Sequence, residues 1–374
     1  MPACWPPNYP ASQCPPSPER NRNRPPMLEL ALRLSLLLEM AFYATLAMHY
    51  GDTSLATAIA LALLAMLALR AAAIAVTYAY AWAYRGPSPS LPLRQTLLMV
   101  LGEYAAMLFT FMVLSPFERL WMGADRLPPR AGTARLNERG AGAAGEALGR
   151  RPPILLIHGY GCSRAAWWWL RSRLEVAGWS VATISLEPIY TSIDNYLEPL
   201  DRRIDDVLAA TGAERVVLVG HSMGGLVARA YLQRYGAARV ARLLTLGTPH
   251  QGSELARLGI GENGRQMRPQ NAWLQALGKP SPALDALAIY SPQDNFVMPA
   301  SLLELPGARK QEIVGLGHLA MLYSPRVVLA LLAALDEPRA ERGEGGESET
   351  EPQPGRADQV KAGSGDANIT DGTA

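Results

Sequence analysis

Residues 215–231 read Arg215-Val-Val-Leu-Val-Gly-His-Ser-Met-Gly-Gly-Leu-Val-Ala-Arg-Ala-Tyr231. The apolar run before Gly220 has the composition of a buried strand, and the segment after Ser222 has apolar residues at helical spacing. A strand that meets a helix in a tight turn between glycines predicts that the Ser222 hydroxyl is held at the edge of a sheet. The stretch therefore predicts an α/β fold with Ser222 as a candidate nucleophile, and a purely structural Gly-rich turn is the alternative.

A serine nucleophile needs a histidine as general base, and in folds with this turn the base follows the serine in the chain. Of the five histidines, only His250 and His318 follow Ser222. No acid at a strand end separates His250 from Ser222, whereas His318 follows a short strand pattern that ends in Gly317. His318 is the predicted base.

The acid that orients the base should lie between Ser222 and His318 in the chain, also at the end of a strand. Asp294 follows the strand pattern that ends near Tyr290 and the turn at Ser291-Pro292. Asp285 precedes that strand and Glu304 lies in a later loop, so both are weaker candidates. We predict that Asp294 accepts the second imidazole N–H of His318; a turn-forming aspartate is the alternative.

Hydrogen-bond donors are also needed for the oxyanion that develops during acyl transfer. The turn itself indicates the N–H of Met223, the residue after the nucleophile. The second donor should follow an early strand, and residues 153–157 are such a run, followed by His158-Gly-Tyr-Gly161. The N–H of Tyr160 is therefore the second predicted donor, unless this stretch is an ordinary strand-to-helix turn.

Five motifs together resemble the lipase and esterase branch of the α/β-hydrolase superfamily. In chain order they are His158-Gly-Tyr-Gly161, Leu218-Val-Gly-His-Ser-Met-Gly-Gly225, Leu246-Gly-Thr-Pro-His-Gln-Gly252, Ser291-Pro-Gln-Asp294 and Gly315-Leu-Gly-His-Leu319. The likeness covers about Pro152 to Asp336. It implies a doubly wound, mostly parallel sheet and an ester-hydrolysing triad of Ser222, Asp294 and His318, but it does not imply the substrate.

The alternation of elements supports the same architecture without the resemblance. Strand-like runs near 153–157, 180–184, 215–219, 243–247, 287–290 and 311–315 alternate with helical segments near 163–177, 195–211, 223–235, 268–277 and 324–335. Such alternation predicts a parallel sheet, and continuously apolar strands predict that both faces are covered. We place this domain at 152–336.

Two features near the predicted site leave alternatives open. The insert at 251–282 is either a movable lid or a plain surface helix that packs Trp273 and Leu277 onto the sheet. The run Trp167-Trp-Trp169 on a helix points in three directions, so its members cannot all line one acyl-binding pocket.

Residues 27–115 differ in composition from the rest of the chain. Three apolar segments, near 28–50, 53–84 and 95–114, each reach the length of about 20 residues that a bilayer span needs. Glu39, Arg70 and Glu103 interrupt them, and in a membrane these charges would have to face one another or a wet cavity. We predict about three membrane helices rather than a soluble helical bundle or a cleaved signal peptide.

The side of the membrane is left open, because the arginines on the two sides of these segments give conflicting counts. Those in the first 26 residues and at 85 and 94 agree with three crossings, whereas those at 119–139 pull the following domain inward. Two crossings and one interfacial helix would satisfy both sets. The expected location is a bacterial inner membrane, with several passes.

The remaining segments carry little chemistry. Residues 1–26 and 337–374 have compositions typical of disorder, and 116–151 read as a linker. A net charge of +2 gives no case for nucleic-acid binding, and three cysteines without metal-ligand spacing give none for a disulfide framework or for zinc. We expect no cofactor, no metal and no protein partner.

The sequence as a whole predicts a membrane-attached serine hydrolase that cleaves a carboxylic ester, with an acyl ester or lipid as substrate. An acyltransferase with the same triad is one alternative. A non-catalytic binding module on a membrane anchor is another.

Overall fold

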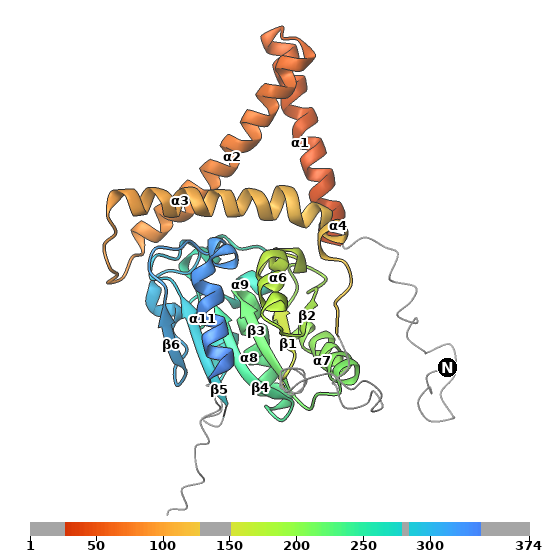
Figure 1. The fold of residues 1–374 in the computed structure, drawn as a ribbon. Coiled ribbons are helices and arrows are strands. Elements are labelled where there is room, and N and C mark those ends of the chain that lie inside the picture. Colours follow the sequence, from red (N-terminus) through yellow and green to blue (C-terminus); the bar gives the residue numbers. More distant parts are fainter. Residues whose placement is uncertain (1–26, 128–150, 279–283, 338–374) are drawn as a thin grey trace, which may run out of the picture. The chain divides into compact units, whose positions relative to one another are not determined.

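The computed structural model describes residues 27–127, 151–278 and 284–337. The predicted disordered ends, most of the predicted linker and the last part of the 251–282 insert lie outside these ranges. The main feature of the described residues is a sheet of six strands with helices on both sides, preceded by long apolar helices (Figure 1).

All neighbouring strands of the sheet are parallel, in the order β2-β1-β3-β4-β5-β6. The strands are β1 (Ile154–Ile157), β2 (Val181–Ile184), β3 (Val216–His221), β4 (Val240–Leu246), β5 (Asp285–Tyr290) and β6 (Arg309–Glu312). The order changes direction between β1 and β3, so the loops after these two strands meet at the carboxyl edge. In an open α/β sheet this is the place where ligands bind.

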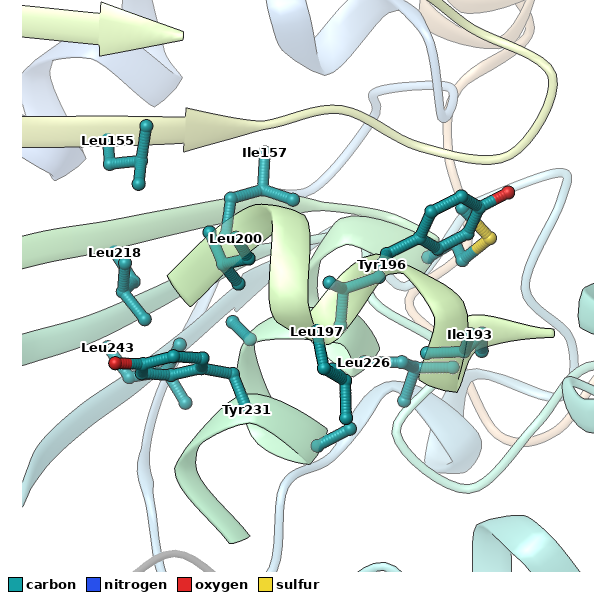
Figure 2. Close-up of a cluster of buried hydrophobic side chains, with 14 of the residues drawn as sticks. Leu155, Ile157, Ile193, Tyr196, Leu197, Leu200, Leu218, Leu226, Tyr231 and Leu243 are labelled. Atoms are coloured by element: carbon teal, nitrogen blue, oxygen red, sulfur yellow. The ribbon is translucent and has the colours of Figure 1, made fainter. Parts of the chain in front are cut away.

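Both faces of the sheet are buried from β1 to β5, as continuous apolar strands require. On one face Leu155 and Leu218 pack against α7 (Leu197–Thr211) and α8 (Met223–Tyr235), and Figure 2 shows this cluster. On the other face Leu156 and Val219 pack against α6 (Trp168–Val176) and α11 (Pro325–Asp336). Neighbouring residues of one strand therefore serve opposite cores, because strand side chains alternate between faces.

Short elements complete the α/β domain between these helices. They are η5 (Arg164–Trp167), η6 (Ile193–Tyr196), η7 (Glu254–Leu258), α9 (Gly261–Gln266), α10 (Ala272–Ala276), η8 (Ala300–Leu303) and η9 (Ala320–Tyr323). The edge strand β6 is exposed along its length and reads Arg-Lys-Gln-Glu, a charged composition that discourages pairing with another chain.

The regular elements of the N-terminal region are all helices, within the residues that the structure describes. It consists of α1 (Met27–Gly51), α2 (Leu55–Ala83), α3 (Leu93–Leu108), η3 (Phe109–Leu114), η4 (Ser115–Phe117) and α4 (Glu118–Met122). The first two helices form a hairpin with a short turn (Figure 1), and the Ser54 hydroxyl caps the start of α2 by accepting the N–H of Thr57. Three stretches, 27–51, 55–83 and 93–122, are long and apolar enough to cross a membrane.

The charges within these helices are paired in two different ways. Arg70 of α2 donates to both carboxylate oxygens of Glu39 in α1, with Nη2 and Oε2 2.6 Å apart. Glu103 of α3 does not join this pair, although the sequence allowed that the three charges face one another. Its carboxylate instead accepts hydrogen bonds from the loop that follows β6.

The segment after α4 is fastened to the sheet through a buried aspartate. Asp125 is ion-paired with Arg171 of α6 (2.9 Å) and with Arg203 of α7 (2.6 Å), and it accepts the N–H of Thr183 in β2 (2.7 Å). Residues 118–127 were expected to belong to a linker. They instead form α4 and make these contacts, because Asp125 lies at β2 between Arg171 of α6 and Arg203 of α7.

Candidate active site

Ser222 lies at the junction of β3 and α8 in a backbone conformation that is rare outside glycine, with φ 55° and ψ −127°. Such strain persists only where the surroundings fix it. A Cβ at Gly224 would lie 2.1 Å from the carbonyl oxygen of Ile157, and one at Gly225 would lie 2.1 Å from Oγ1 of Thr248. The glycines of the turn are thus required by the packing of β1 and of the loop after β4 against it.

His318 and Asp294 form a buried hydrogen-bonded pair, with Nδ1 and Oδ2 2.7 Å apart. The other carboxylate oxygen of Asp294 accepts the N–H groups of Phe296 (2.8 Å) and Val297 (2.9 Å), which fixes its orientation. Burial by itself lowers the pKa of His318. The negative charge and hydrogen bond of Asp294 and the charge of Glu103 outweigh that effect, so the net shift of the pKa is upward.

The His318 ring is held between two other rings. Phe296 stacks on it at 5.0 Å between centroids, and His221 lies at 4.6 Å, tilted by 45°. Burial and the nearby His318 lower the pKa of His221 well below its ordinary value. The neutral His221 is therefore assigned as the donor, through Nε2, to the carbonyl of His318 at 3.2 Å. Because His221 immediately precedes Ser222, this contact brings the end of β3 to the His318 loop.

The loop after β1 also reaches the serine. A Cβ at Gly159 would lie 2.9 Å from Cβ of Ser222, so Gly159 passes directly against it. The next residue, Tyr160, uses its hydroxyl to donate to the carbonyl of Ile260 (2.8 Å) and to accept its N–H (3.0 Å). Met223 is the first residue of α8, where an N–H has no acceptor within the helix.

The alternative acids and bases lie elsewhere. Asp285 is the first residue of β5 and pairs with Arg242 and Arg309, each at 3.0 Å, and Glu304 pairs with Lys310 at 2.9 Å. His250 is buried, with Nε2 2.9 Å from the hydroxyl of Thr245. Within the described ranges, no group of three or more acidic, histidine or cysteine side chains is arranged to hold a metal ion.

The insert that follows β4, predicted at 251–282, has features of both a lid and a packed surface segment. Leu277 is buried and Trp273 donates its indole N–H to Asp194 of η6 at 3.0 Å, so the end of the insert packs onto the domain. Leu258 and Ile260 are 57% and 61% exposed, and the backbone of Ile260 is what the Tyr160 hydroxyl contacts. The insert thus presents apolar side chains to solvent at the site.

The three consecutive tryptophans point in different directions, as their spacing predicts. Trp167 is fully buried in the core between the sheet and α6. Trp168 packs edge to face against Phe109 and Trp121 of the N-terminal region. Trp169 lies next to the guanidinium of Arg173.

Cys162, two residues after Tyr160, is a free and buried thiol. Burial raises the pKa of this thiol to about 12.

Two further polar residues at the site are not indicated by the sequence motifs. Glu103 and Asn295 bind backbone N–H groups of residues 318–320. The position of Asn295 directly after Asp294 is a local signal for it. Glu103 lies more than two hundred residues before the loop that it contacts, and nothing in its own segment indicates the contact.

Comparison with known proteins gives a family match inside this domain. Residues 152–263 match the model of the alpha/beta hydrolase fold family. A triacylglycerol lipase of Burkholderia plantarii is 37% identical over 139 residues, which cover 34% of this chain and 38% of the lipase. One of Pseudarthrobacter phenanthrenivorans is 38% identical over 114 residues, which cover 28% of this chain and 35% of the lipase. The chain thus spans little more than a third of each lipase.

A plant esterase and a solved lipase structure are also similar. Methylesterase 17 of Arabidopsis thaliana is 28% identical over 197 residues, which cover 44% of this chain and 68% of that protein. The mature form of the Bacillus licheniformis lipase BlEst2 has 18% identity and a TM-score of 0.46, over 50% of this chain and 92% of that one.

Proposed function

Because the chain belongs to the lipase and esterase branch of the α/β-hydrolase superfamily, we propose that it cleaves carboxylic esters through an acyl-enzyme on Ser222. His318 takes the proton of the Ser222 hydroxyl while the Ser222 oxygen attacks the acyl carbon of the ester. The alcohol then leaves with that proton, and a water molecule, activated by the same imidazole, releases the acid. The hydrogen bond of 2.7 Å between His318 and the buried Asp294 is the observation that carries the proposal.

Each remaining group has a role in this scheme. Asp294 holds the imidazole in one tautomer and stabilises the imidazolium that forms. The N–H groups of Met223 and Tyr160 stabilise the oxyanion, and removal of one such donor typically costs about 10²–10³ in kcat. Support for Met223 comes from its position at the first turn of α8, and support for Tyr160 from the approach of Gly159 to Ser222.

A fluorophosphonate probe tests the nucleophile directly. The full-length protein in detergent should be labelled, Ser222→Ala should lose the label, and His318→Ala should react much more slowly. Ser163→Ala is the control, because this serine is buried at the start of η5 and caps that turn without a role in the scheme. Undiminished labelling of Ser222→Ala would contradict the proposal.

Acyl lipids or long-chain esters are the proposed substrate class. The apolar N-terminal helices and the exposed Leu258 and Ile260 support it, since both present apolar surface on the molecule that carries the site. A series of esters graded by acyl length should give kcat/KM that rises with chain length. Product analysis with an added alcohol separates hydrolysis from acyl transfer, and transfer that predominates in water would replace the first proposal by the second.

We propose further that α1 and α2 cross a membrane while α3 lies at its surface. The hairpin exposes large apolar side chains along its length, such as Leu38, Phe42 and Leu64. The start of α1 contacts Glu187 and α2 contacts Asn295, both in the hydrolase domain. A hairpin whose two ends reach the same domain returns to the side from which it started.

The third helix has two different faces, which supports a surface position. Met99, Glu103 and Met107 are buried, whereas Leu97 and Leu101 are 54% and 60% exposed. An exposed apolar face on a docked helix suits the boundary between lipid and water.

This arrangement places all the flanking arginines on one side, which the positive-inside rule assigns to the cytoplasm. A green fluorescent protein fused after residue 374 should therefore be fluorescent, and an alkaline phosphatase fused there should be inactive. The opposite pair of results would refute the two-crossing arrangement.

A further inference from the structure

The loop that carries His318 is held by three successive backbone N–H groups. The N–H of His318 donates to Oδ1 of Asn295 (3.0 Å), that of Leu319 to Oε1 of Glu103 (3.0 Å) and that of Ala320 to Oε2 of Glu103 (2.8 Å). All three acceptors are side-chain oxygens that come from outside the loop. The conformation of the loop therefore depends on where those side chains are held.

Glu103 reaches this loop from α3, and the site is shaped to admit it. The side chain is fully buried, and within the described ranges it makes no ion pair with an arginine or lysine. A Cβ at Gly317 would lie 2.4 Å from Oε2 of Glu103, so glycine before His318 leaves the space that the carboxylate fills. A buried carboxylate is costly unless it is hydrogen-bonded and compensated. Here the N–H groups of Leu319 and Ala320 bind it, and the imidazolium of His318 is the compensating cation whenever His318 is protonated.

The second support comes from α2 through one intermediate residue. Asn295 is fully buried, and its Nδ2 donates to the hydroxyl of Thr77 at 2.7 Å. The hydroxyl in turn donates to the carbonyl of Ile74, one turn earlier in the same helix, at 2.8 Å. Thr77 thereby fixes the amide of Asn295 with its oxygen toward the N–H of His318.

Apolar packing joins the same elements. Leu319 is buried in a cluster with Ile74 of α2 and with Ala106 and Met107 of α3. Further along, the hydroxyls of Thr110 and Tyr323 are 2.6 Å apart. The helices thus contact the His318 loop by side chains of both kinds, over more than one turn.

On this geometry we propose that Glu103 and Thr77 are positioning residues for His318, so that the N-terminal apolar helices complete the active site as well as anchor it. The inference rests on the proposed function, since it assigns the support of the proposed base. Glu103 acts by geometry and by charge, whereas Thr77 acts by geometry alone. Displacement of a catalytic group by about 1 Å can cost 10²-fold in rate.

Removal of the Glu103 charge should change the pKa of His318 in a way that can be measured, because the other titratable groups around His318 stay in place. These are Asp294 after β5 and His221 at the end of β3, with Tyr78 of α2 packed in the Leu319 cluster. Removal of one of two carboxylates that face the imidazolium lowers the pKa of His318. Removal of the Thr77 hydroxyl leaves both carboxylates in place.

The test compares Glu103→Gln, Glu103→Asp, Thr77→Val and the control Tyr104→Phe in the full-length, detergent-solubilised protein. Tyr104 neighbours Glu103 on α3, but its hydroxyl donates to Leu67 of α2 and not to the His318 loop. The readouts are kcat and KM for a short soluble ester, the pH profile of kcat/KM, and the rate of fluorophosphonate labelling.

Glu103→Gln should lower kcat by about 10-fold to 100-fold with little change in KM, and should move the acid limb of the profile to lower pH. Thr77→Val should lower kcat without moving the acid limb of the pH profile. Glu103→Asp keeps the negative charge, so its acid limb should lie at the same pH as in the unmodified protein. Tyr104→Phe should have the kcat and the pH profile of the unmodified protein.

Wild-type kcat and an unmoved limb in Glu103→Gln would overturn the inference, even if Ser222→Ala still abolishes labelling. If Glu103→Gln fails to fold, wild-type kcat in both Glu103→Asp and Thr77→Val would overturn it. Loss of the proposed function is distinguishable, because an unmodified protein that neither reacts with the probe nor hydrolyses esters would fail before these variants are compared.

Discussion

Arg70 and Glu39 form a two-point ion pair between neighbouring helices of an apolar hairpin, with side chains that are 19% and 15% exposed. A charged side chain near the centre of a membrane helix costs about 3 kcal/mol on insertion scales. If the hairpin crosses a membrane as proposed, pairing removes much of that cost, since each group satisfies the other.

The pair predicts a non-additive effect of two substitutions. Glu39→Leu or Arg70→Leu alone should each reduce the amount of protein that survives heating in detergent, because each leaves one charge without its partner. The double variant should recover to near the level of the unmodified protein. Single and double variants that lose equal amounts would show that the pair is not coupled.

The pH dependence of activity follows from the upward shift of the His318 pKa. The general base must be neutral, so kcat/KM should fall as the pH drops through a pKa above the ordinary value of 6.5. The stability of the fold changes with pH in the opposite direction to the activity. The stabilising interaction of protonated His318 with Asp294 is fully present below pH 6.5, and it is lost as the pH rises through the shifted pKa of His318. A profile of kcat/KM against pH that bends below the ordinary pKa would contradict the shift.

Asp125 predicts a large loss of stability upon substitution. Asp125→Ala should destabilise the protein by about 3 kcal/mol, because the buried Arg171 and the partly exposed Arg203 lose the carboxylate that they share. The value is at the lower end for a broken buried pair, since Arg171 keeps its pair with Glu175. The control is Glu198→Ala, which removes an exposed pair with Arg202 and should cost about 0–1 kcal/mol. Thermal unfolding of the two variants beside the unmodified protein gives the comparison, and equal midpoints would refute the prediction.

The strained turn at Ser222 predicts a strong contrast between two glycines. In Gly224→Ala the new Cβ would overlap the backbone of Ile157, so β1 and the turn could not keep their positions. We expect loss of both stability and probe labelling. Gly102→Ala in α3 meets no atom within 4 Å and should be neutral or slightly stabilising, because alanine favours a helix over glycine by about 0.5–1 kcal/mol. Labelling of Gly224→Ala at the rate of the unmodified protein would disprove this account.

The sequence predicted best the elements that are decided locally. The helix after Ser222 was expected at 223–235 and is found there, because Gly224 and Gly225 define its start and Gly236 its end. All six strands were expected in order. Several boundaries differ. β3 ends at His221, two residues late, and β4 and β5 begin at Val240 and Asp285, three and two residues early, so Asp285 lies in its strand and does not precede it. β6 ends at Glu312, before the apolar Ile313-Val314 that its pattern included.

What the sequence could not predict depends on contacts between distant segments. Glu103 reads as a charge within a membrane span, and only the packing of α3 against the β6–η9 loop reveals that it binds backbone N–H groups there. Likewise, Asp125 reads as part of a linker, although cations from two helices surround it. Periodicity and motifs carry no information about such pairings.

The buried thiol of Cys162 has a practical consequence. With a pKa of about 12 and almost no exposed surface, it holds a negligible fraction of the reactive thiolate at neutral pH. Maleimides should therefore leave it unmodified in the folded protein. Once Cys4 and Cys14 are replaced, single cysteines introduced at Thr53, in the turn of the hairpin, and at Val176, at the end of α6, would report separately on access from each side of intact vesicles in the proposed two-crossing arrangement. Cys162, beside the proposed oxyanion site, could stay in place.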